Sequence, residues 1–168
     1  MESRAKLLGH PIHPMLIVFP LGLLGMAVIF DIIRQVFGMT GLALASYYMI
    51  AAGIITGLLA ALFGLVDWLA IPHGTRAKSI GAWHGIGNVV IVVLFAGSWW
   101  LRRGAPDDPS ALAFVLGLIG LGLALITGWL GGELVDRLGV GVDDGANVDA
   151  PSSLSGGPVR SGPSARAV

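Results

Sequence analysis

The fold is decided by Gly41–Ala70, GLALASYYMIAAGIITGLLAALFGLVDWLA, a run of 30 residues in which Asp67 is the only charged side chain. A helix needs about 20 apolar residues to cross the hydrocarbon core of a bilayer. This run is too long for a strand, and a helix satisfies all of its backbone hydrogen bonds within the segment. It therefore predicts a transmembrane helix that tilts or projects from the bilayer.

Three more segments have the same character. They are Pro14–Phe37, Ile80–Leu101 and Ala111–Leu134. Either Asp108 or Ser110 provides an N-cap for the last of them. We therefore expect an all-α protein, an integral membrane four-helix bundle that occupies residues 1–142. Residues 143–168 are rich in Gly, Ser, Pro and Ala without an apolar period, which predicts a disordered C-terminal tail.

The composition excludes several function classes. Of the 168 residues 55% are hydrophobic and 12% are charged, half the charged share typical of soluble domains. Ten basic residues balance ten acidic ones, which argues against a nucleic-acid-binding surface. The chain has no cysteine, so disulfides, thiolate zinc sites, iron–sulfur clusters and c-type haem attachment are excluded. A metal would have to bind His, carboxylate or Met.

Basic residues near the span ends set the expected orientation. The side with both termini has five and the opposite side has three: Arg4, Lys6, Arg76, Lys78 and Arg137 against Arg34, Arg102 and Arg103. This bias predicts cytoplasmic termini.

Most chemically interesting side chains map to the end of the bundle that holds the termini. All four histidines lie there, in the order His10, His13, His73 and His84, together with Asp67 and Glu133 at span ends. Ionisable groups are costly in a membrane, so such a grouping is a hypothesis of function. We expect Asp31, at the opposite boundary, to pair with Arg34 three residues later.

Helical spacing indicates which of these groups face inward. Gly53, Gly57, Ala60, Gly64 and Asp67 follow one face of the second span, and small residues at this spacing let helices approach closely. In the third span His84 and Asn88 are four residues apart and share a face. We expect both faces to point into the bundle.

The segment His10-Pro11-Ile12-His13-Pro14 restrains two histidine backbones, because proline limits its own dihedral and that of the preceding residue. Imidazole and carboxylate together bind transition metals. The predicted metal ligands are His10, His13, Asp67, His84 and Glu133. The alternative cofactor is a b-type haem with His13 and His84 as axial ligands and Arg76 or Lys78 near the propionates.

The motifs HPIHP, GLVDW, AWH and GWLGGELV occur together at residues 10–14, 64–68, 82–84 and 128–135. With them the sequence resembles an uncharacterised family of bacterial membrane proteins, a domain of unknown function with about four helices. The resemblance extends from about His10 to Val142 and implies a bacterial inner-membrane protein, but no activity. Asp136 stands where that family is commonly aromatic.

Two functions remain open, and the sequence does not decide whether the protein is an enzyme. The first is binding of a redox metal or b-type haem at the cytoplasmic boundary, with electrons passed to a membrane redox partner. The second is a non-catalytic scaffold or assembly subunit in which the same His and carboxylate groups form a structural hydrogen-bond network. Either function is compatible with a homo-oligomer.

Overall fold

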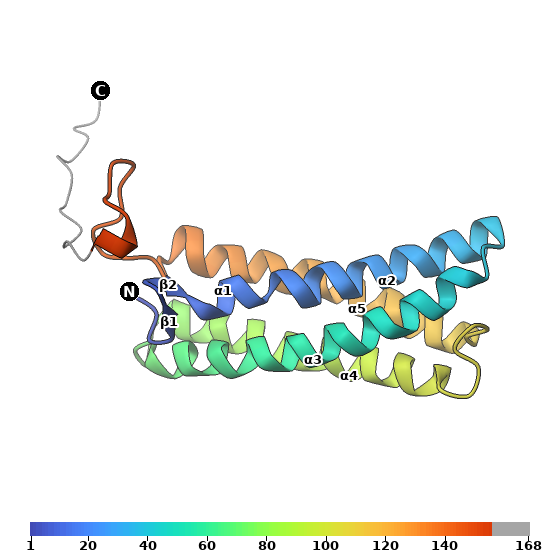
Figure 1. Ribbon diagram of the computed structural model, residues 1–168. Coiled ribbons are helices and arrows are strands. Elements are labelled where there is room, and N and C mark those ends of the chain that lie inside the picture. Colours follow the sequence, from blue (N-terminus) through green and yellow to red (C-terminus); the bar gives the residue numbers. More distant parts are fainter. Residues whose placement is uncertain (156–168) are drawn as a thin grey trace, which may run out of the picture.

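Four long helices lie side by side in the computed structural model, which describes residues 1–155 (Figure 1). The first span consists of α1 and α2, separated at Ile17, and the last continues from α5 into a π-helix, η1. The helices are α1 Ile12–Leu16, α2 Val18–Phe37, α3 Gly41–Ala70, α4 Arg76–Arg102, α5 Ala111–Gly132 and η1 Glu133–Arg137. The prediction of an all-α four-helix membrane bundle is confirmed.

The predicted boundaries agree with these helices to within a few residues. Those of α3 coincide with the prediction, while α4 begins four residues before the predicted Ile80. The earlier start follows from the N-cap, because the Thr75 hydroxyl accepts a hydrogen bond from the backbone N–H of Lys78. Of the two caps expected for α5, Ser110 is the one that forms, and it accepts from the N–H of Ala113.

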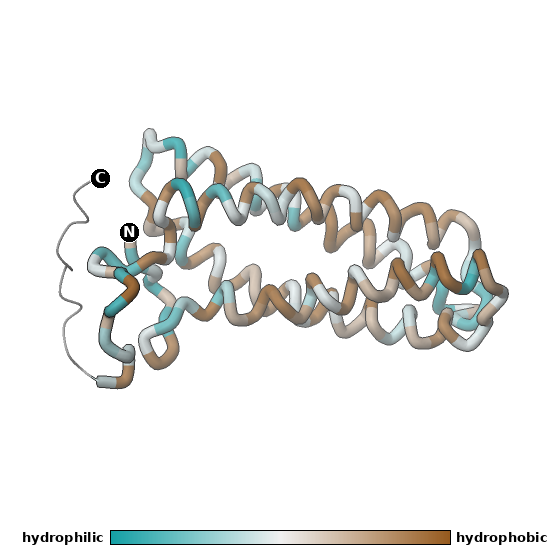
Figure 2. Tube along the Cα trace, turned by 90° about the horizontal axis from the view of Figure 1, so that it is seen from above, coloured by the Kyte–Doolittle hydropathy of each residue, from teal (hydrophilic) through white to brown (hydrophobic). Residues whose placement is uncertain are grey.

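All four spans are long and apolar enough to cross a membrane. Large apolar side chains point outward along their whole length, as Leu62, Val93 and Leu125 do with 61–70% exposure. Polar residues gather toward the two ends of the bundle (Figure 2). This arrangement is that of a protein whose helix surfaces contact lipid rather than water.

Small residues set the packing between helices. α2 packs on α3, α4 packs on α5, and α3 also contacts both α1 and α4. A Cβ at Gly53 would lie 2.6 Å from Leu24, and one at Gly64 would lie 2.9 Å from the ring of His13. The small-residue face of α3 therefore faces the first span, as the spacing predicted.

The N-terminal segment folds back over one end of the bundle. It forms a short antiparallel hairpin of β1 (Lys6–Leu7) and β2 (His10–Pro11), whose turn has positive φ at Leu8 and Gly9. The first part of the predicted tail lies against this segment and includes a short 3-10 helix, η2 (Ser153–Ser155). The remainder of that tail, 156–168, lies outside the described residues.

Candidate functional site

Two histidines from opposite sides of the bundle meet near the end that carries the N-terminus. His13 lies on α1 and His84 lies on α4, with α3 packed against both helices. Their ring centroids are 6.3 Å apart and the ring planes are nearly perpendicular, at 86°. Both rings are partly buried. The structure thus joins the two residues expected to be axial haem ligands.

His13 is fixed by α3. Its Nδ1 lies 2.8 Å from the backbone carbonyl oxygen of Ala60, so Nδ1 carries the proton and donates it. The absence of a side chain at Gly64 gives the ring its place, since a Cβ there would come within 2.9 Å of Nδ1 and Cε1. The Nε2 lone pair of His13 has no hydrogen-bond partner among residues 1–155.

His84 is fixed in the same way by α5. Its Nδ1 donates to the backbone carbonyl oxygen of Thr127 at 2.9 Å, and a Cβ at Gly131 would lie 3.2 Å from its Cε1. Its Nε2 accepts from the amide of Asn88 at 3.2 Å. The shared inward face of His84 and Asn88, predicted from their spacing, is confirmed.

Asp67 does not join the histidines, because the N-terminal segment occupies its carboxylate. The hydroxyl of Ser3 lies 2.8 Å from both carboxylate oxygens, and the backbone N–H of Arg4 donates to Oδ1 at 2.7 Å. The N–H of Ala5 lies 3.3 Å from the same oxygen. Asp67 thus anchors the N-terminal segment, and it pairs with neither His84 nor Arg76.

The other two predicted ligands also lie apart from the imidazoles. Glu133 accepts from Arg76 at 2.6 Å, and His10 lies 3.3 Å from the hydroxyl of Ser153. Within residues 1–155 no group of three or more His, Asp or Glu side chains could hold a metal ion. Of the five predicted metal ligands, the structure therefore brings only His13 and His84 together.

A second contact joins the two terminal segments. The ammonium of Lys6 donates to Asp143 at 2.6 Å and to Glu2 at 2.8 Å. These hydrogen bonds, the one to Asp143 above all, raise the pKa of Lys6 above 10.5. The N-terminal amine adds a bond to the carbonyl oxygen of Gly139 at 3.0 Å. The terminal segments thus cover the bundle end next to the histidine pair.

The opposite end contains a buried ion pair that corrects the expected partner of Asp31. Asp31 accepts two hydrogen bonds from Arg102, at 2.9 and 2.5 Å, and their side chains are 4% and 0% exposed. Arg34 pairs instead with Asp108, whose side chain is 85% exposed. The prediction of an Asp31–Arg34 pair was therefore wrong, because α2 turns Asp31 toward α4.

Two serines complete this buried group, which sequence reasoning missed. Ser46 on α3 and Ser98 on α4 each lie 3.3 Å from the guanidinium of Arg102, and both are fully buried. Ser46 also donates to the carbonyl oxygen of Ala27 on α2, and Ser98 to that of Ala113 on α5. The one available signal was the position of Asp31 and Arg102 at the same membrane boundary.

The chain belongs to the family described as predicted membrane protein (DUF2231), whose model matches residues 9–144. No curated protein and no solved structure matches the chain. The match covers all four spans and both histidines, and it agrees with the resemblance of the sequence motifs.

Proposed function

We propose that the protein holds a transition-metal centre between His13 and His84, within the membrane bundle. The observation that carries the proposal is the pair of imidazoles, 6.3 Å apart between centroids, each with Nδ1–H bonded to a backbone carbonyl. Metal-ligating histidines nearly always donate their other ring N–H in this way, which fixes the tautomer and leaves Nε2 free to ligate.

The separation of the rings suits a shared metal. With metal–nitrogen bonds of about 2 Å, two imidazoles on opposite sides of one ion have centroids about 6 Å apart. The two glycines that lie against the imidazole rings support the same interpretation. A Cβ at either Gly64 or Gly131 would press on one of the rings, so both helices leave room for imidazole at these positions.

The donor set fits two kinds of centre. A b-type haem needs only two axial protein ligands, because the macrocycle supplies the other four, and its iron would supply one-electron chemistry. A bare ion would need further ligands beyond the two imidazoles, since Asp67 and Glu133 are engaged elsewhere. The proposed ligands are therefore His13 and His84 alone. Arg76 and Lys78 lie at the same end of α4, but to meet a charged edge of the cofactor they would have to release Glu133 and the carbonyl oxygen of Trp68.

We place this centre at the cytoplasmic boundary of a bacterial inner membrane, with a redox protein of that membrane as its electron partner. The side of the bundle that holds both termini has more basic residues than the opposite side, which supports cytoplasmic termini. The terminal segments that cover this end offer the partner a polar surface.

The test is to express the protein with ample iron and haem and purify it in mild detergent, then to measure its absorption spectrum and bound metals. A Soret band or a metal in equal amount with protein is expected in the wild type and in His73→Ala, which changes a loop histidine. The Soret band or the bound metal should be lost in His13→Ala and His84→Ala. A colourless, metal-free wild type would refute the proposal, and retention of the cofactor by His84→Ala would refute the ligand assignment.

The second candidate is a scaffold in which the histidines only hold helices together. It is favoured by the amide of Asn88, which occupies Nε2 of His84 at 3.2 Å. Treatment with a chelator distinguishes the metal centre from the scaffold. If the centre holds metal, EDTA or haem extraction lowers the melting temperature of the wild type and not of His84→Ala. If it is a scaffold, the chelator has no effect, while His84→Ala is destabilised from the outset.

A further inference from the structure

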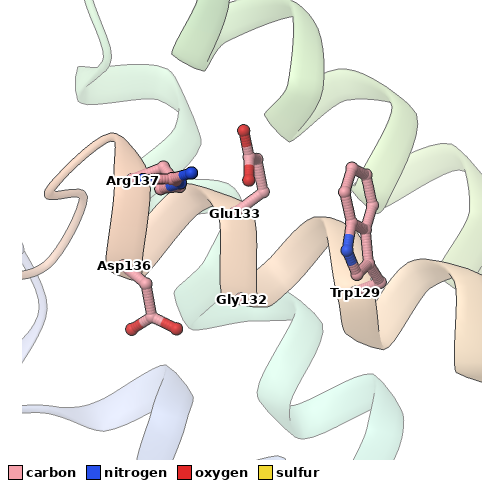
Figure 3. Close-up of a pocket in the computed structure, with 5 residues that line it drawn as sticks. All are labelled: Trp129, Gly132, Glu133, Asp136 and Arg137. Atoms are coloured by element: carbon pink, nitrogen blue, oxygen red, sulfur yellow. The ribbon is translucent and has the colours of Figure 1, made fainter.

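The π-helix at the end of α5 forms one wall of a pocket that neither His13 nor His84 lines. The pocket has a volume of about 270 Å³ and is lined by Trp129, Gly132, Glu133, Asp136 and Arg137 (Figure 3). Gly132 lines it without a side chain, and a Cβ there would have one atom within 4 Å, an oxygen of Asp136 at 4.0 Å. The i to i+5 bond from Leu138 N–H to the carbonyl oxygen of Glu133 creates the wider turn.

The position of the pocket along α5 matches the headgroup layer of a bilayer. Ala111–Gly132 contains 22 residues without a charge, which is about 33 Å of helix and thus one hydrocarbon thickness. The charged residues begin at Glu133. Trp129, 66% exposed, lies one turn before this point, where tryptophan commonly anchors a helix at the membrane interface.

The charges in the pocket include two that have no partner among residues 1–155. Glu133 is paired, because Arg76 donates a hydrogen bond to its Oε1. Asp136 and Arg137 are both exposed, and neither has a hydrogen bond or an ion pair to any of residues 1–155. In Figure 3 the side chains of Glu133 and Asp136 leave the chain in different directions around Gly132. A free carboxylate and a free guanidinium beside one cavity are complementary to a ligand that carries both charges.

We propose that this pocket binds the headgroup of a phospholipid that carries a primary ammonium beside its phosphate, as phosphatidylethanolamine does. Asp136 accepts hydrogen bonds from the ammonium, which enters the pocket beside Gly132. Arg137 binds the phosphate. The acyl chains then continue along the apolar surface of α5, on which Leu125 and Ile126 are exposed.

Native mass spectrometry of the full chain tests this, with phosphatidylethanolamine and phosphatidylcholine of identical acyl chains offered in equal amounts. Both lipids have the phosphate, but only the first has N–H donors. We expect phosphatidylethanolamine to be retained in preference, and Asp136→Asn to reduce that retention about fivefold, the effect of one partly exposed ion pair. Gly132→Leu, which puts a large side chain into the pocket, should abolish the preference.

Asp107→Asn is the matched control, since it removes one exposed carboxylate at the opposite boundary. Equal retention of the two lipids would overturn the proposal, as would an Asp107→Asn variant that loses the lipid as Asp136→Asn does. Phosphorylethanolamine without acyl chains distinguishes the sources of the headgroup. If it displaces the lipid at equal concentration, the ligand is a soluble phosphate ester and not a membrane lipid.

Discussion

The Asp31–Arg102 pair should be the most sensitive polar contact in the bundle, and a double-mutant cycle can measure it. The perturbations are Asp31→Asn, which keeps the shape and removes the charge, Arg102→Met, and the two combined. Because both side chains are at most 4% exposed, neither charge has solvent to replace a lost partner.

The magnitude follows from the partners of the guanidinium. Its five N–H donors have five acceptor contacts, of which the two to Asp31 are the shortest, and the other three go to Ser46, Ser98 and the carbonyl oxygen of Ala113. Removal of one member of a buried pair costs about 3–5 kcal/mol, whereas removal of both is often close to neutral. We expect each single variant to lose about that much stability and the double variant to lose much less than their sum.

The assay is reversible unfolding in mixed micelles as the fraction of SDS rises, with the free energy of unfolding taken from the transition. Asp108→Asn serves as the control, because it breaks the Arg34–Asp108 pair at the same boundary, where Asp108 is 85% exposed. An exposed pair contributes about 0–1 kcal/mol, so this variant should unfold almost as the wild type does. If Asp31→Asn costs no more than Asp108→Asn, or if the single losses simply add, the pair is not desolvated and the reasoning fails.

Three further predictions concern packing and the covered end of the bundle. Gly120→Ala should destabilise by about 1–3 kcal/mol in the same assay, because its Cβ would lie 2.7 Å from the buried ring of Phe95, while Gly122→Ala, which meets open space, should not. Asp67→Asn should weaken the anchoring of the N-terminal segment, seen as faster amide hydrogen exchange at residues 3–5 than in the wild type. Lys6 contributes stability that is complete below pH 10.5 and is lost as the pH rises through its raised pKa, so the melting temperature of Lys6→Met should fall less above that pH than that of the wild type.

The helices could be predicted because hydrophobic length is a local property. Gly41–Ala70 needs no information from the rest of the chain to be a span, and the same holds for its small-residue face, which follows from helical periodicity. His84 and Asn88 were paired correctly for the same reason, since residues four apart on one helix are neighbours whatever surrounds them.

Contacts between helices could not be predicted in this way. Asp31 and Arg102 are 71 positions apart, and the rotation of α2 that turns Asp31 inward depends on how three other helices pack around it. Local spacing therefore favoured Arg34. Likewise, nothing in the sequence shows that Ser3 and its neighbours fold back onto Asp67, which removes that carboxylate from the expected group of metal ligands.

Under the proposed function, the free lone pairs at the covered end determine which side chains would bind a metal with the smallest loss of existing hydrogen bonds. For Asp67 to ligate a metal it would have to release the charge-assisted hydrogen bonds from Ser3 and Arg4, each about 1.5–3 kcal/mol. Nε2 of His13 releases nothing among residues 1–155, and Nε2 of His84 gives up one bond of 3.2 Å to Asn88. The two Nδ1 atoms lie at hydrogen-bond distance from backbone carbonyl oxygens, so ligation through Nε2 would leave both of these hydrogen bonds in place. The imidazole pair is therefore the site at which a ligand displaces least of the existing structure.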